Sequence, residues 1–481
     1  MSDDTPRNND GLSEDELWAS LEGVVGSERT SKLIDIVEFR MNAEDYEGAL
    51  PIIDSAVESA RDAEIDQVLA KALYIKCTVD KSLDNYADAI QAGLESARIF
   101  ERYDSVVGLI EAYNEVSVCY ELSGELTEAL KYVDIAINSA KQTDNTFELG
   151  FVYKQKYDVI CKLDFPFEDQ LEVLSLARQA FRESGLVEYV LQSDEEAARI
   201  LMDNGDYKAA QNLLQDCFNV AITRKESRAA YFAQQLGTCL RVSSCYREAI
   251  EPLTFAYDYA VKHQLTVDIA HAQIELAVCQ WYMHEHEKAF ETLARARANF
   301  DVCGHDGGVL DCDLFRAPWL HMSDRFAEAA ALNELLVETL SGFSKFMARA
   351  RLADNFRLSG KLHEALAAAT PEENEEDFSS RSSWFWRESI RARVLIALNR
   401  TEEAWEIARD CNNKGLSTAG YETQGFMLEL LGDLNESRGV EHAAIHHWTQ
   451  AIAMYLSANN MEAAKNLSYR LRPDEHTDQI Q

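Results

Sequence analysis

The sequence has few of the residues that interrupt helices. Among 481 residues there are 7 prolines and 21 glycines. Proline breaks a helix interior and glycine weakens it, so their scarcity is typical of a largely helical protein. The same scarcity excludes collagen-like and proline-rich disordered chains.

Basic residues are also scarce relative to acidic ones. The chain has 46 Lys and Arg against 83 Asp and Glu, for a formal net charge of −37. A surface of this sign repels phosphate backbones and anionic lipids. We therefore expect an acidic protein with neither nucleic acid nor a membrane as its partner.

Long apolar runs are missing as well. No run reaches the roughly 18 apolar residues of a membrane span, and residues 1–12 lack the apolar segment of a signal peptide. Cys77, Cys119 and Cys161 are evenly spaced within expected helices, as buried small side chains at equivalent places would be. We expect no disulfides and a reducing, cytoplasmic location.

No catalytic motif is present. The sequence contains no glycine-rich phosphate loop, no GxSxG elbow and no HExxH. Three small groups contain metal-ligating residue types: His442 with His446, His284 with His286, and Cys303 with His305 and Cys312. None offers four ligands at a recognised spacing. We expect no enzymatic activity, no metal and no cofactor.

What the sequence does contain is a repeat. A short motif, typified by Gly205-Asp206-Tyr207-Lys208-Ala209-Ala210, recurs along most of the chain. Its last position, called the key position below, is alanine in every copy but one. The key positions are Ala49, Ala89, Ala129, Gln170, Ala210, Ala249, Ala289, Ala329, Ala365, Ala404 and Ala444. A steady period of this kind indicates one elongated repeat array rather than the three domains that length alone suggests.

Each unit contains two helical stretches separated by a short break. In the third unit, apolar residues recur at helical spacing before and after Ser123-Gly124. A second column of mostly small residues lies twelve positions before the key position. Its members are Val37, Cys77, Ser117, Asp158, Ala198, Gly237, Ala277, Ala317, Ala353, Ala392 and Gly432. We expect the two columns to face each other where the helices of an antiparallel pair approach closely.

These residues resemble the tetratricopeptide repeat family. The family pattern of a turn glycine followed by a helical alanine is matched by Gly124 with Ala129, by Gly205 with Ala210 and by Gly360 with Ala365. The period of about 40 departs from the family's basic unit of about 34. It looks like the arrays of bacterial regulators and of kinesin light chain-like scaffolds. The resemblance implies an all-α solenoid, a right-handed superhelix of about eleven helical hairpins, with a groove lined by the first helix of each.

We expect the following organisation: a disordered acidic tail (1–12), an N-terminal capping helix (13–29), units one to seven (30–303), units eight to eleven (304–460), a C-terminal capping helix (461–472) and a disordered tail (473–481). Trp18 is expected to cover the first unit. Three segments break the pattern. They are a rigid turn at Asp164–Phe167, a flexible link at Gly304–Gly308 and an acidic mobile loop at Pro371–Asp377.

Basic residues are enriched eight positions before the key position, where the resemblance places the groove. The candidate protein-binding residues are Lys81, Lys162, Arg241, Trp281, Arg357, Trp386 and Arg393. They suit an acidic protein segment or a C-terminal carboxylate. The alternative is that these long basic side chains balance neighbouring acids. Trp384-Phe385-Trp386 is likewise either a binding anchor or part of the core.

Taken together, the sequence favours a non-catalytic protein–protein interaction scaffold or adaptor that binds a protein segment in a concave groove. The alternative is a regulatory sensor whose superhelix responds to a peptide or small effector and controls a partner protein. An enzyme is the least favoured interpretation of the chain, and it is retained only because acidic clefts can contain sites without a known motif.

Overall fold

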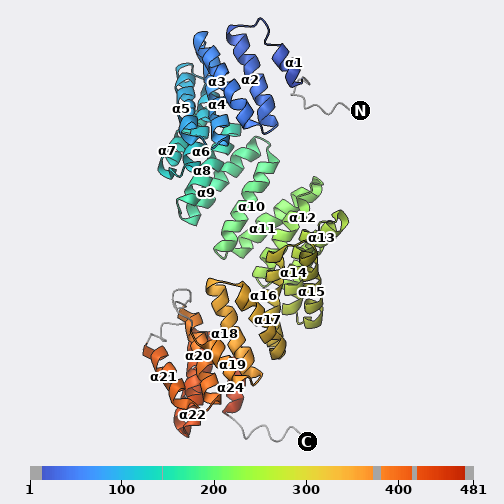
Figure 1. Cartoon of the computed structure of the whole chain (residues 1–481), viewed down its shortest axis with the longest axis vertical. Helices are drawn as coiled ribbons and strands as arrows, with labels where there is room; N and C mark the ends of the chain where they lie inside the picture. Colours follow the sequence, from blue (N-terminus) through green and yellow to red (C-terminus); the bar gives the residue numbers. More distant parts are fainter. Residues whose placement is uncertain (1–12, 144, 372–380, 414–419, 472–481) are drawn as a thin grey trace. The chain divides into compact units, whose positions relative to one another are not determined.

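The computed structural model describes residues 13–143, 145–371, 381–413 and 420–471. These residues form twenty-four helices and no strand (Figure 1). The chain divides into two units, Met1–Pro252 and Leu253–Gln481. The expected all-α array of helical hairpins is confirmed. The division of the repeats at 303/304 stays a prediction, as do the two tails, which lie entirely outside the described residues.

The first unit contains α1 (Glu14–Ala19), α2 (Gly26–Asn42), α3 (Tyr46–Asp62), α4 (Asp66–Ser82), α5 (Tyr86–Arg102), α6 (Val106–Leu122), α7 (Leu126–Lys141), α8 (Thr146–Lys162), α9 (Phe167–Glu183), α10 (Val187–Asp203), α11 (Tyr207–Thr223) and α12 (Ala229–Val242). Helix α13 (Tyr246–His263) spans the division. The second unit contains α14 (Thr266–Tyr282), α15 (His286–Val302), α16 (Asp306–Met322), α17 (Phe326–Thr339), α18 (Gly342–Leu358), α19 (Leu362–Ala369), α20 (Arg381–Ala397), α21 (Thr401–Asn413), α22 (Tyr421–Ser437), α23 (Glu441–Ser457) and α24 (Met461–Arg470).

The helices from α2 to α23 form hairpins, each with an even-numbered first helix and an odd-numbered second helix. Within the first unit the first helices α2, α4, α6 and α8 contact one another in sequence. In the second unit α14 contacts α16, and α18, α20 and α22 contact one another in sequence. In these stretches the first helices of successive hairpins therefore lie side by side (Figure 1).

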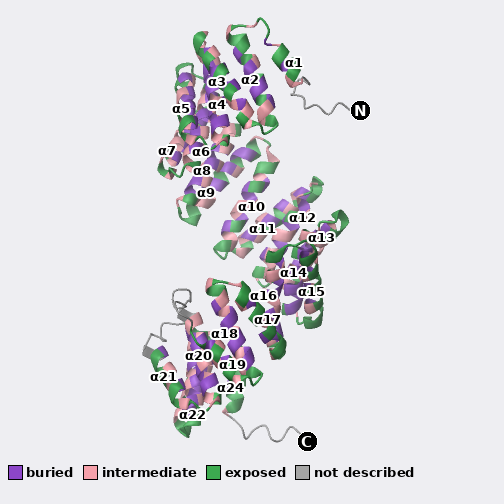
Figure 2. Ribbon diagram, in the orientation of Figure 1, coloured by how far each residue is buried: buried purple, intermediate pink, exposed green. Residues whose placement is uncertain are grey.

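Small residues set the spacing within each hairpin. All ten key alanines are at most 1% exposed. The side-chain Oγ of Ser117 in α6 donates to the carbonyl oxygen of Ala129 in α7 at 2.9 Å. The two columns therefore do face each other across the hairpin, as the sequence predicted. Figure 2 shows that the buried positions recur along the helices where these pack against their neighbours.

The turn inside each hairpin has a fixed backbone conformation. The residue five positions before each key alanine has a positive φ, from 57° at Asp324 to 85° at Gly124. This left-handed conformation is uncommon for residues with a side chain. Only four of these ten residues are glycine, so the turn recurs more regularly than a search for turn glycines indicates.

The fourth hairpin, α8–α9, has a turn that is one residue longer. Its residue with positive φ, Asp164, lies six positions before Gln170, and Pro166 directly precedes α9. The side-chain Nε2 of Gln170 donates to the carbonyl oxygen of Phe165 at 2.8 Å. The expected turn at Asp164–Phe167 is therefore present. Gln170, which breaks the alanine pattern, stabilises this turn through its hydrogen bond.

The longer turn shifts the register of α8. This helix ends eight positions before the key position, whereas the other first helices end seven before it. Tyr157, which is 3% exposed, therefore takes the place that small residues occupy in the other hairpins. The sequence comparison assigned that place to Asp158, one residue too far along. Lys162 is displaced in the same way from the place that Lys81 occupies in α4.

Two sequence-based expectations are wrong in detail. The N-terminal cap docks through Leu17 of α1 and the following Leu21, at most 9% exposed, whereas Trp18 is 41% exposed. The supposed link at 304–308 is not a flexible linker, because its last three residues form the first turn of α16. A Cβ at Gly308 would lie 2.4 Å from the ring of Phe300, so this glycine allows close packing.

The acidic segment Pro371–Asp377 lies, apart from Pro371, outside the described residues.

Within the described part of the chain, no helix is both long and apolar enough to cross a membrane. The same residues contain no group of three or more His, Cys, Asp or Glu side chains placed to hold a metal ion. All ten cysteines are free thiols, as expected.

We expect a larger residue at a key position to destabilise the array. Ala89→Leu in α5 forces a larger side chain into a site with no exposure, so it lowers stability by about 1–3 kcal/mol. Ala87→Leu, at an exposed position of the same helix, is the matched control. Urea unfolding followed by circular dichroism measures both variants. Equal unfolding midpoints for the two would contradict the close approach at the key positions.

Thiol reactivity provides a second test of the packing. Burial raises the pKa of Cys217 and Cys312 to about 12 and that of Cys239 to about 11. Buried thiols of this kind react slowly with a disulfide reagent, because the thiolate is the nucleophile. We expect exposed Cys303 to react first in the native protein, and all ten cysteines to react in denaturant. Fast modification of Cys217 under native conditions would show that α10 and α11, which enclose this thiol, are not closely packed.

Candidate functional site

The candidate residues from the sequence are divided between the two units. Lys81 in α4 and Lys162 in α8 belong to the first unit, as does half-buried Arg241 in α12. The other candidates belong to the second unit: Trp281 in α14, Arg357 in α18, and Trp386 and Arg393 in α20. Their role in binding stays a prediction, and their local surroundings differ.

Four of the basic candidates form ion pairs with carboxylates. Lys81 Nζ lies 2.6 Å from Glu115 of α6, and Lys162 Nζ lies 2.8 Å from Glu121 of α6. Both pairs join neighbouring first helices. The other two pairs lie in the second unit, where Arg357 Nη2 is 2.6 Å from Asp354 and Arg393 Nη2 is 3.3 Å from Glu429. These four cations therefore neutralise acids of the array itself.

Arg393 belongs to a larger network. Burial alone lowers the pKa of its guanidinium, but the carboxylates of Glu429 and Asp433 outweigh burial and raise it. Tyr455 Oη donates to Glu429 at 2.6 Å, and Trp448 Nε1 donates to Asp433 at 3.0 Å. Arg393 thus ties α20 to α22 and, through the shared carboxylates, to α23.

Trp281 is part of the core. It is 6% exposed, and its ring stacks on that of Trp319 in α16, with centroids 4.8 Å apart and an interplanar angle of 2°. Phe290 packs edge-on against both rings. This aromatic cluster joins two successive hairpins of the second unit.

Trp386 has a different environment. It lines a cavity of about 390 Å³ in the second unit. As far as the described residues show, the cavity is lined only by the first helices α16, α18, α20 and α22. Its lining residues are Ala317, Pro318, His321, Met322, Met347, Arg351, Asp354, Asn355, Ser383, Trp386, Glu422, Thr423 and Phe426. One wall therefore spans hairpins eight to eleven.

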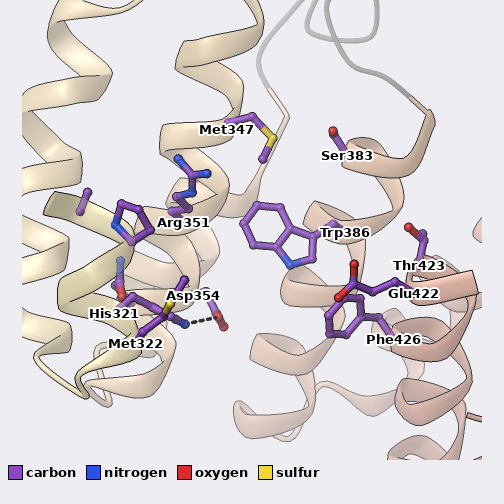
Figure 3. Close-up of a pocket in the computed structure, with 13 residues that line it drawn as sticks. His321, Met322, Met347, Arg351, Asp354, Ser383, Trp386, Glu422, Thr423 and Phe426 are labelled. Carbon is purple, nitrogen blue, oxygen red and sulfur yellow. Dashed lines mark hydrogen bonds and ion pairs between the residues drawn. The ribbon is translucent and has the colours of Figure 1, made fainter. Parts of the chain in front are cut away.

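The apolar side of this cavity is made by three equivalent residues. Met347, Trp386 and Phe426 each lie eighteen positions before the key alanine of their hairpins. All three side chains are half-buried. Figure 3 shows the indole of Trp386 between Met347 of α18 and Phe426 of α22. Of its sequence neighbours, Phe385 is fully buried and packs edge-on against Trp384, so only Trp386 of the three faces the cavity.

The polar side of the cavity contains Arg351 and a small hydrogen-bonded group. His321 Nδ1 lies 2.7 Å from Asn355 Oδ1, and Asp354 pairs with Arg357. Arg351 is half-buried and makes no hydrogen bond or ion pair with any described residue. Burial lowers the pKa of its guanidinium, yet an arginine stays protonated at neutral pH.

Trp386 was predicted from the sequence as a candidate, but Arg351, Met347 and Phe426 were not. A position fourteen before the key alanine holds Arg351 in α18, but Ile390 in α20 and Leu430 in α22, both buried. The available signal was a basic residue at a position that is apolar in the two adjacent hairpins (Phe315 and Ile390) and acidic in several others (Glu115, Glu196 and Glu275). The position eight before the key alanine, which the sequence predicted to line the groove, instead holds cations that are mostly paired with carboxylates.

A second cavity, of about 580 Å³, lies in the first unit at the irregular fourth hairpin. Tyr157, Asp158, Gln170 and Glu196 are among its lining residues. Burial raises the pKa of the Asp158 and Glu196 carboxyls, against the opposing effect of Lys154, which pairs with both. The polar groups of this cavity therefore largely satisfy one another.

No family model matches the chain, and no curated protein matches it. Among solved structures, the chain is similar to the apo form of RapI (13% identity, TM-score 0.41, covering 61% of this chain and 99% of that one). It is also similar to a tetratricopeptide repeat protein from Parabacteroides merdae (15% identity, TM-score 0.42, covering 58% and 98%). A third similar structure is the APC/C hetero-tetramer Cut9-Hcn1 (11% identity, TM-score 0.40, covering 95% and 92%). Likenesses of this degree say nothing about function.

The ion pair between Lys81 and Glu115 can be tested as a structural element. Both side chains are about one-fifth exposed, so Lys81→Met leaves a largely buried carboxylate without its partner. We expect a loss of about 1–3 kcal/mol, and we expect the added change Glu115→Gln to restore part of it. Chemical unfolding of the single and double variants measures the coupling. Additive effects would show that Lys81 does not stabilise the array through Glu115.

Proposed function

We propose that the protein is a non-catalytic scaffold that holds a segment of a partner protein against the first helices of hairpins eight to eleven. One observation supports this most strongly: a single cavity is lined by four successive first helices. A segment laid across these helices contacts all of them, which is how repeat arrays use their extended surfaces.

The character of the cavity lining agrees with this proposal. The volume of about 390 Å³ falls within the range of about 300–1,000 Å³ that ligand pockets occupy. Its walls combine an apolar stripe with a few polar groups, which is the composition of a recognition site. Aromatic and arginine side chains in such places contribute most of the binding energy at protein interfaces.

We test the proposal by placing a photo-reactive amino acid at position 347 of the full-length chain. Irradiation in a lysate of the native source should link one partner protein to this position. Trp386→Ala should reduce the linked product at least about tenfold, because truncating a hot-spot tryptophan costs about 2 kcal/mol or more. Mass spectrometry identifies the product.

Tyr282 supplies the matched control, because it is an exposed aromatic residue of the second unit that does not line the cavity. The variant Tyr282→Ala should leave the product unchanged. A product at position 347 that survives Trp386→Ala would show that the partner binds there without the indole, which would contradict the proposed contribution of Trp386. The alternative function, a sensor for a small effector, predicts that no protein is linked at position 347.

A further inference from the structure

We infer that the segment held in this cavity presents a carboxylate to Arg351 and a bulky apolar side chain to the stripe formed by Met347, Trp386 and Phe426. The inference rests on the proposed function, because it specifies the chemistry of the partner at the same site. The partner is a protein whose binding segment has Asp or Glu close to an aromatic or large aliphatic residue.

The first step is the isolated charge of Arg351. Half-burial lowers the pKa of its guanidinium without any described carboxylate offsetting the effect. A buried charge without a partner is unfavourable, and pairing it with a carboxylate relieves part of that cost. A guanidinium also offers two parallel donors to a carboxylate, so the pair is directional as well as favourable.

The second step is that the cavity's own acids are already engaged. Asp354 Oδ1 pairs with Arg357 at 2.6 Å, and Asp354 Oδ2 lies 3.9 Å from His321 Nε2 (Figure 3). Glu422 accepts a hydrogen bond from Asn460, the residue that precedes α24, at 2.9 Å. No carboxylate of the described cavity lining pairs with Arg351, so we infer that its acceptor comes from the occupant.

The third step is a second donor at the cavity wall. Asn355 has no exposed surface, and its Nδ2 has no hydrogen-bond partner among the described residues. Its Oδ1 already lies 2.7 Å from His321 Nδ1, which fixes the orientation of the amide. This unsatisfied donor adds to the local excess of hydrogen-bond donors over acceptors behind the cavity wall, but without exposed surface it does not itself contact an occupant.

The fourth step is the adjacent apolar surface. Met347, Trp386 and Phe426 come from three successive first helices and remain half-buried. A large apolar side chain laid against them removes area on both partners from water. Figure 3 shows Arg351 and Met347 on the same side of the indole of Trp386, so an acid and a bulky residue a few positions apart can reach both contacts.

The experiment is a selection of random twelve-residue peptides displayed on phage against the purified full-length chain. Parallel selections use Arg351→Met and the control Arg400→Met, which removes a cation that pairs with Glu403 at the surface. Wild type and the control should enrich Asp or Glu within a few positions of Trp, Phe, Leu or Met. The Arg351→Met variant should keep the apolar enrichment and lose the acidic one.

One enriched peptide is then synthesised with its acid intact and with that acid changed to the amide. Fluorescence anisotropy measures both. The amide should bind wild type at least about tenfold more weakly, as expected for a charge-assisted hydrogen bond. The same change should have little effect on binding to Arg351→Met. Circular dichroism of each variant confirms that the helices are intact.

The outcomes separate this inference from the proposed function. If the Arg351→Met selection still enriches acids, or wild type enriches none, the carboxylate inference is wrong. The scaffold proposal then survives provided that the selected peptides still lose binding with Trp386→Ala. If no peptide is selected, both are overturned. If free indole-3-acetate binds in an Arg351-dependent way and the peptides do not, the occupant is a small carboxylic acid rather than a protein segment.

Discussion

The close approach of two helices at small residues is the constraint on which the rest of the structure depends. Ser117 Oγ reaches the carbonyl oxygen of Ala129 only because neither helix has a large side chain at the crossing. A bulky residue there would separate the helices and lose dispersion contacts along both. Because this contact is repeated in successive hairpins, neighbouring first helices come to lie side by side, and the cavity in the second unit is a space between such helices.

Charge is the second organising factor. Because acids outnumber bases 83 to 46, half-buried cations readily find a carboxylate on a neighbouring first helix, as Lys81 and Lys162 do. Such pairs contribute to the register between hairpins. Because a carboxylate of the array already balances each of these cations, they are less available to pair with an acid of a partner protein. An unpaired cation is therefore more informative in this chain than in a neutral one, and Arg351 is such a cation among the described residues.

The fold could be predicted from the sequence because the information is local and repeated. The period, the key alanines and the small residues before them specify one hairpin, and eleven copies specify the array. The site was harder to predict, since Lys81 and Glu115 pair between successive hairpins and nothing in either residue shows it. The same applies to the longer turn of the fourth hairpin, which moves Tyr157 into the place expected for Asp158. Comparing each position with its equivalents in neighbouring hairpins would have revealed Arg351 against Ile390 and Leu430.

Departures from a repeat pattern differ in what they imply. In the fourth hairpin, Gln170 breaks the alanine column, but its side chain bonds to the Phe165 carbonyl and secures the turn. That departure has a structural explanation within the chain. Arg351 stands where the adjacent hairpins have apolar Phe315 and Ile390, and it forms no hydrogen bond or ion pair with the described residues in return. Positions that break a local rule without compensation are expected where function requires them. That argument, together with the neighbouring apolar stripe, favours a binding site in hairpins nine to eleven over one at the paired cations of the first unit.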